Sequence, residues 1–352
     1  MQTFGLTHAA GALKIDANRL TTQAGSLLSS NGSITATMIP GASSGVIGSI
    51  SHSGVMTGSA ITLSGTTISG GTASQITATG ALNATATAAV NLFGETSAAS
   101  IALNGASVEL RGRAFADLMT LTASGAITTR DGVYARDRLT ANAGGSFINL
   151  GYLEAVNKLA VTANAFDNRA GAEARSNDIA VTTDAWASNA GKMFGARDIS
   201  FNAGTNVTNV AGGSIDAGSL GVTAAGNFTN SGTIDVFGFF GNVTGSSTNN
   251  SVLRATTYLG LTGGAFTNAA AATLWSDNHI FIRSTGAVRN FATTVVHAKA
   301  LDIRAASFEN TGQLRAREVI NIADITGTVT NSGVLYACLL YTSPSPRDRT
   351  RS

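Results

Sequence analysis

Residues 151–190 read GYLEAVNKLAVTANAFDNRA followed by GAEARSNDIAVTTDAWASNA, two units of 20 residues with the same internal order. In the first unit, Leu153 and Ala155 flank a polar residue, a polar corner follows, and Leu159 and Val161 alternate with their neighbours in the same way. Side chains that alternate with period two lie on one face of a β-strand. These units therefore predict short, half-buried strands separated by polar corners.

The same order returns about every 20 residues from Gly132 to Ala337. A fixed period of this length is the sequence signature of a repeat architecture. The apolar pair of the second segment marks the register in most units. After Leu159 and Val161 this pair is Ile179 and Val181, Ile199 and Phe201, Leu220 and Val222, Leu259 and Leu261, Ile280 and Ile282, Leu301 and Ile303, and Ile320 and Ile322.

A third apolar position and an asparagine close each unit. The asparagine comes two residues after the apolar residue, or three after Trp186. Asparagine tolerates turn geometry and pairs with its own kind when copies are stacked, so we expect a hydrogen-bonded ladder. The loosest unit offers either Asn249 or Asn250 as its member. The predicted buried aromatic stack is Phe147, Phe166, Trp186, Phe228, Phe266 and Phe308, and the predicted ladder is Asn149, Asn168, Asn189, Asn209, Asn230, Asn268, Asn290, Asn310 and Asn331.

Three short strands in about 20 residues cannot bury their own apolar face, but stacked copies can. The units lack the 3.6-residue spacing of helices and are rich in Gly, Thr and Asn, which disfavours leucine-rich and helical repeats. The sequence therefore predicts an all-β fold, a right-handed parallel β-helix (solenoid) with about 20 residues per coil.

The chain divides into three parts by composition. Residues 1–131 predict irregular, uncharged Gly/Ser/Thr-rich coils of the same solenoid, since residues 20–94 hold no Asp, Glu, Lys or Arg yet keep the alternation. Residues 132–337 hold the regular repeats. Residues 338–352 (CLLYTSPSPRDRTRS) resemble a translated sequencing adapter, so we expect a non-native, disordered tail on a fragment of a longer gene.

Charge and composition exclude several classes of function. The chain has 22 basic and 20 acidic residues, and 19 of each remain once the three arginines and one aspartate of the tail are set aside. Without a basic excess we expect no nucleic-acid partner. No stretch of about 18 consecutive strongly apolar residues occurs, so we expect no membrane insertion. The only cysteine, Cys338, lies in the tail.

A β-helix also carries polysaccharide lyases and hydrolases, whose sites need clustered carboxylates. The nearest equivalent is the vertical pair Asp178 and Asp198, which fall on one corner of neighbouring coils. Lys158 precedes them in the same column and Arg197 adjoins Asp198, so we interpret the row as solvated surface charge. The four histidines lack further metal-type residues at ligand spacing. We therefore predict no catalytic, metal-binding or cofactor-binding residue and no enzymatic activity.

The repeat columns resemble the haemagglutinin repeats of filamentous-haemagglutinin-like exoproteins, and the resemblance covers Gly132 to Ala337. It implies a segment of a large secreted adhesin on the surface of a Gram-negative bacterium. It also implies two-partner secretion through an outer-membrane transporter, and a host or bacterial surface receptor as the partner. Two alternatives stay open: the stalk of a contact-dependent growth-inhibition toxin, and a carbohydrate-active β-helix enzyme.

Overall fold

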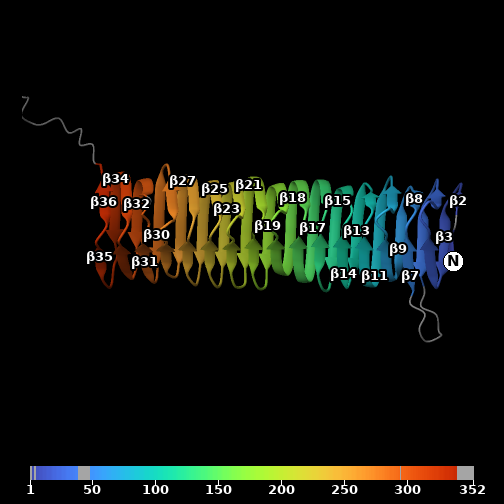
Figure 1. Ribbon diagram of the computed structural model, residues 1–352, viewed down its shortest axis with the longest axis horizontal. Helices are drawn as coiled ribbons and strands as arrows, with labels where there is room; N and C mark the ends of the chain where they lie inside the picture. Colours follow the sequence, from blue (N-terminus) through green and yellow to red (C-terminus); the bar gives the residue numbers. More distant parts are fainter. Residues whose placement is uncertain (1, 4, 39–47, 294, 339–352) are drawn as a thin grey trace, which may run out of the picture.

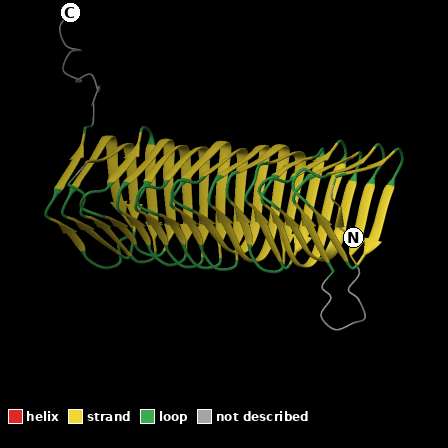
Figure 2. Ribbon diagram, turned by 45° about the vertical axis from the view of Figure 1, so that its right-hand side comes forward, coloured by secondary structure: helices red, strands yellow, loops and turns green. Residues whose placement is uncertain are grey.

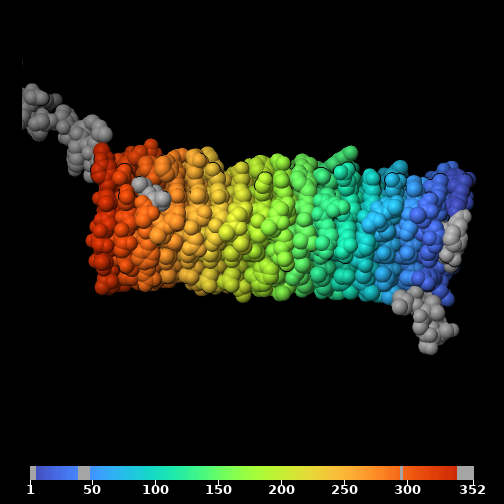
Figure 3. Space-filling view, viewed as in Figure 1, coloured from blue at the N-terminus to red at the C-terminus, as the bar shows by residue number. Residues whose placement is uncertain are grey.

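A computed structural model describes residues 2–3, 5–38, 48–293 and 295–338. These residues form strands and no helix, and the strands pair in parallel with their counterparts about 20 residues away. The result is a β-solenoid of about 16 turns. At a strand spacing of about 4.8 Å the stack is roughly 75 Å long. Figure 1 and the space-filling view in Figure 3 show it as a straight rod in which chain position runs steadily from one end to the other.

Each coil contributes to three faces, which we number in chain order. The loops and turns run along the edges of the rod (Figure 2). Strands confined to the first face are β2 (Leu6–Ala9), β5 (Leu27–Ser30), β8 (Val55–Gly58), β10 (Gln75–Ala78), β12 (Glu95–Ser97), β29 (Thr273–Ser276) and β36 (Val334–Ala337). Those confined to the second are β3 (Leu13–Ala17), β6 (Ile34–Met38), β13 (Ser100–Gly105) and β30 (His279–Ser284).

The third face is built mostly from short strands. They are β1 (Gln2–Thr3), β4 (Arg19–Thr22), β7 (Ser49–His52), β14 (Ser107–Leu110), β16 (Ile127–Thr129), β20 (Ala187–Asn189), β22 (Val207–Asn209), β24 (Phe228–Asn230), β26 (Ser247–Asn249), β28 (Phe266–Asn268), β31 (Ala287–Asn290), β33 (Ser307–Asn310) and β35 (Val329–Asn331).

The remaining strands bend around a corner. Two of them join the second and third faces, β9 (Ile61–Gly70) and β11 (Ala81–Leu92), and two cover all three, β17 (Gly132–Asn149) and β18 (Tyr152–Asn168). The others join the first and second: β15 (Ala114–Ala123), β19 (Glu173–Thr183), β21 (Lys192–Ala203), β23 (Ser214–Ala224), β25 (Thr233–Val243), β27 (Val252–Gly263), β32 (Val295–Arg304) and β34 (Gln313–Ala323).

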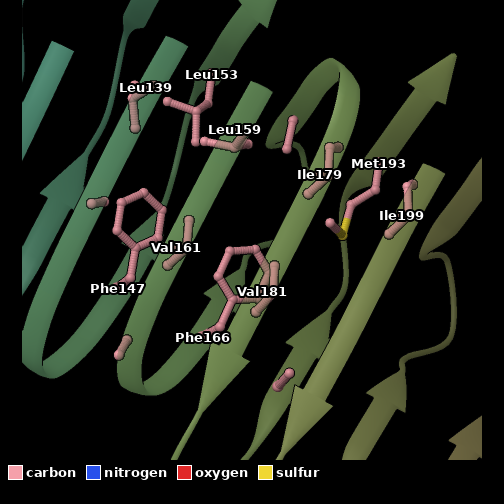
Figure 4. Close-up of a cluster of buried hydrophobic side chains, with 14 of the residues drawn as sticks. Leu139, Phe147, Leu153, Leu159, Val161, Phe166, Ile179, Val181, Met193 and Ile199 are labelled. Carbon is pink, nitrogen blue, oxygen red and sulfur yellow. The ribbon is translucent and has the colours of Figure 1, made fainter. Parts of the chain in front are cut away.

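The predicted period places like residues above one another. Leu139 pairs with Leu159, which pairs with Ile179, and the series continues along the second face. These side chains point into the rod (Figure 4) and are fully buried. Because neighbouring coils present similar apolar side chains, each column extends the core without a gap. The predicted parallel β-solenoid is confirmed.

The uncharged segment between residues 20 and 94 continues the same stack. Its strands β4 to β11 pair in parallel one coil away and bury aliphatic side chains such as Ile50, Ile68 and Leu82. β17 begins at Gly132 and pairs with β15 and β16, so the stack has no break at residue 131. Of the predicted tail, residues 338–352, all but Cys338 lie outside the described residues.

One member of the predicted aromatic stack is wrong. Trp186 is 40% exposed, and Ala187 takes the buried position between Phe166 and Val207. The reason is the period of a strand: a residue two before the ladder asparagine points inward, and Trp186 lies three before it. The Phe201 ring, from the unit that follows Ala187, has its centroid 6.4 Å from the centroid of the Phe166 ring. Phe166 therefore keeps an aromatic neighbour despite the small alanine. The other five predicted members, Phe147, Phe166, Phe228, Phe266 and Phe308, are buried.

Candidate functional site

The ladder asparagines form one continuous row inside the third face. The Asn149 amide Nδ2 donates to Asn168 Oδ1 at 2.9 Å, and Asn168 Nδ2 donates to Asn189 Oδ1 at 2.7 Å. The same bond repeats coil by coil to Asn331, with Asn249 rather than Asn250 in the loosest unit. All nine predicted ladder residues therefore lie in the row, which Asn249 completes.

Most of the ladder amides also donate a hydrogen bond to a backbone carbonyl. Asn149 Nδ2 donates to the carbonyl of Glu173 at 3.2 Å, and Asn168 Nδ2 donates to the carbonyl of Lys192 at 3.1 Å. Asn149 and Asn168 are fully buried, so each donor and acceptor needs a partner inside the protein. The row meets this need by joining the corner of one coil to the corners of the coils that follow.

The row begins at Thr129. Its hydroxyl Oγ1 donates to Asn149 Oδ1 at 2.9 Å. In the preceding coils the same column holds Leu110 and Leu92. Closer to the N-terminus the column holds Gly70 and then His52. The His52 Nδ1 atom lies 2.6 Å from Thr22 Oγ1. The amide ladder is therefore a property of the coils after residue 131.

The candidate acidic pair lies in register as predicted. Asp178 pairs with Asp198 in one direction and with Lys158 in the other. Arg197 Nε donates to Asp178 Oδ1 at 3.0 Å, and the second guanidinium nitrogen contacts the other carboxylate oxygen. A carboxylate engaged in this way is a poor general base or cation ligand. This geometry gives no support for a catalytic or cation-binding role of Asp178 and Asp198.

Other charges also pair, often between successive coils. Glu109 Oε1 accepts from Arg111 Nε at 3.1 Å and from Arg130 Nε at 2.9 Å. Partial burial acts to raise the pKa of Glu109, but the two guanidinium groups outweigh it and hold that pKa below its ordinary value. Further pairs are Arg136 with Asp117, Arg254 with Asp235, Arg289 with Glu309, Lys299 with Glu318, and Arg304 with Asp324.

The histidines do not assemble into a metal site. Among the described residues, no group of three or more His, Cys, Asp and Glu side chains is placed to hold a metal ion. His8 bonds to Ser29, and His297 stacks on Trp275 with ring centroids 4.1 Å apart. Burial and the nearby charge of Arg317 lower the pKa of His297.

An outward aromatic column on the first face was missed by sequence reasoning. Phe115 and Tyr134 occupy the same outward position in neighbouring coils and stack at 5.0 Å with nearly parallel rings. Tyr152 lies 5.3 Å from Tyr134 and donates from its hydroxyl to Glu154 at 2.7 Å. Burial and this bond raise the pKa of Tyr152 to about 12. The signal was present in the register, because Phe115 lies between buried Ala114 and Ala116.

A second group of exposed aromatic rings lies on the second face and its corner. Phe237, Phe240 and Tyr258 are each more than two-fifths exposed. The Tyr258 ring lies over Gly238, where a Cβ atom would come within 2.8 Å of the ring. Glycine therefore lets this ring approach the strand backbone closely. These rings add apolar surface to an exterior that also exposes aliphatic side chains such as Leu118 and Val156.

Comparison with protein-family models, curated proteins and solved structures gave no match to this chain. The resemblance to haemagglutinin repeats therefore rests on the columns alone. Within the described part of the chain, no helix is long and apolar enough to cross a bilayer.

Proposed function

We propose that this chain is a rigid segment of a large secreted bacterial surface adhesin, a β-helical rod that mediates attachment or display. The observation that carries the proposal is the asparagine row from Asn149 to Asn331. It occupies the same repeat column on which the resemblance to filamentous-haemagglutinin-like exoproteins rests. A stack bonded along its axis by backbone and side chains is suited to holding a binding surface away from a cell.

The export route follows from the same proposal. The chain would cross the outer membrane unfolded through its transporter and stack coil by coil outside the cell. Each coil needs only its predecessor as a template, because the strand pairs join neighbouring coils. The absence of cysteine before residue 338 removes disulfide formation as a step. The receptor would be a molecule on a host or bacterial surface.

Three experiments test this function. Sequencing the genomic locus on both sides should recover an export signal with a two-partner secretion domain upstream. A toxin cassette downstream would instead assign the segment to a growth-inhibition stalk. Beads coated with the purified chain should attach saturably to epithelial or bacterial cells, whereas beads coated with heat-unfolded chain should not. Turnover of polyuronides by the purified chain would replace the adhesin with a carbohydrate-active enzyme.

A further inference from the structure

A hollow of about 430 Å³ lies at the corner between the first and second faces, in the coils around β12 and β15. Its base is formed by small side chains, among them Ser97 and Ala99. Phe115 stands at one side, and Asp117 and Arg136 lie at the rim. The volume falls within the range of about 300–1,000 Å³ that is usual for small-molecule sites.

The hollow arises from a step in side-chain size along the outward column. Ser97 pairs with Phe115, and Phe115 pairs with Tyr134. Tyr134 covers one face of the Phe115 ring, since the two rings stack at 5.0 Å with an interplanar angle of 6°. The opposite face is turned toward the coil of Ser97, whose side chain is too short to cover it. One aromatic face therefore forms a wall above a base of small residues.

The rim supplies hydrogen-bonding groups of both kinds. Arg136 Nη1 lies 3.6 Å from Asp117 Oδ1, and both side chains are more than half exposed. At that separation the carboxylate keeps lone pairs free to accept, and the guanidinium keeps N–H groups free to donate. Neighbouring hydroxyl groups of one ligand can bond to both at once. The two charges cancel, so the rim favours a neutral, hydroxyl-rich ligand over an ion.

We propose that this hollow binds one hexopyranose residue of a neutral glycan. A pyranose ring offers a face of C–H groups, which packs on an aromatic ring, and an edge of hydroxyl groups, which bonds to a carboxylate and a guanidinium. Phe115 lies on a strand that is paired on both sides, so the aromatic wall of the site is formed before the ligand arrives. The inference goes beyond the proposed function, because a rod can display other domains without binding sugar itself.

Saturation-transfer NMR on the purified full chain tests the site. The probes are the methyl glycosides of glucose, galactose, mannose and N-acetylglucosamine at millimolar concentration. At least one should receive saturation on its ring C–H protons. Phe115→Ala should weaken its binding about tenfold, a loss typical of one aromatic contact. Phe237→Ala, which removes an equally large exposed ring elsewhere, should leave binding unchanged.

A second variant guards against misfolding of Phe115→Ala. Asp117→Asn keeps the shape of an exposed side chain and should weaken binding several-fold while the circular dichroism spectrum stays that of the parent. Absence of transfer to all four glycosides overturns the proposal, as does equal transfer to the parent chain and to both variants. Neither result bears on the adhesin proposal, whose locus and attachment tests do not involve these sugars.

Discussion

The third face is built in two different ways along the rod. In coils after residue 131 one inward column holds an asparagine in each coil and the other often holds an aromatic ring, as at Asn168 and Phe166. In coils before it the first of these columns holds aliphatic residues such as Val90, and the asparagine column holds residues of several kinds, among them Leu92 and His52. The backbone pairing is the same in both regions. Coil spacing is therefore set by strand hydrogen bonds, and the columns accommodate inward side chains of different kinds.

The two regions also differ on their outside. Residues 20–94 carry no charged side chain, whereas many of the later coils are joined by ion pairs such as Arg254 with Asp235. Threonine and serine cover much of the exterior of the uncharged region instead, which suits β-strands but gives no charge to oppose edge-to-edge association. The contrast makes it possible to separate the contributions of buried aromatic rings, buried amides and surface ion pairs to stability. Single substitutions measure each contribution in turn.

The largest effect is expected in the aromatic column. Phe166→Ala should lower the free energy of unfolding by about 3–5 kcal/mol. Phe166 is fully buried and stacks on Phe147 at 5.9 Å, so its loss leaves a cavity that strand pairing keeps open. Urea unfolding followed by circular dichroism measures the change.

Trp186→Ala is the matched control for the corrected member of that column. Because Trp186 is 40% exposed and the buried column position belongs to Ala187, its removal should cost less than about 1 kcal/mol. Equal losses from Phe166→Ala and Trp186→Ala would mean that the indole packs inside in solution, and that Ala187 does not hold the column position.

The next effect concerns the amide ladder, where the chain offers two adjacent asparagines. Asn249→Ala should cost about 1–3 kcal/mol, because it leaves Asn230 Nδ2 without its side-chain acceptor and Asn268 Oδ1 without its donor in the row. Asn250→Ala should cost a few tenths of a kcal/mol at most, since that side chain is exposed and bonds only to Ser231. Hydrogen exchange should show the coils of β24, β26 and β28 losing protection in the first variant alone.

Local alternation was enough to predict the repeat, because Leu159 and Val161 face the core wherever their strand lies in the stack. The ladder followed as well, since its asparagines recur in register. Trp186 misled because it stands one residue before the inward position, which Ala187 holds. The hollow at Phe115 depends on which residue of the preceding coil pairs with Phe115, and that residue is the small Ser97. That register shifts between Ala116 and Leu118 at a corner of variable length, which alternation cannot reveal.

His52 tests the ladder column where it contains no asparagine. Burial lowers the pKa of His52, although the backbone carbonyls of Gln75 and Gly54 act to raise it. The unfolded chain therefore takes up a proton at higher pH than the folded chain does. The stability of this region is fully present above the ordinary histidine pKa of 6.5 and is lost as pH falls through 6.5 toward the lower folded value.

His52→Asn should reduce that acid sensitivity. The urea midpoint should fall less between about pH 8 and pH 5.5 in the variant than in the parent chain, where the imidazole titrates. His297, whose pKa is also lowered, is present in both proteins and cancels in the difference. Identical pH profiles would show that His52 is solvated and does not join Thr22 inside the column.

The smallest effect is expected for the surface charges that distinguish the later coils. Arg197→Ala removes the partner of Asp178, but about two-thirds of the arginine side chain is exposed, so the loss should stay below about 1 kcal/mol. The difference between parent and variant should shrink further in 1 M salt, where the Debye length falls to about 3 Å and interactions between exposed charges are screened more strongly. If Arg197→Ala lowered the free energy of unfolding as much as Asn249→Ala does, the corner charges would stabilise the stack as strongly as the buried amides. The uncharged coils within residues 20–94 show that the stack forms without such pairs, which is why the amides and the apolar columns are expected to dominate.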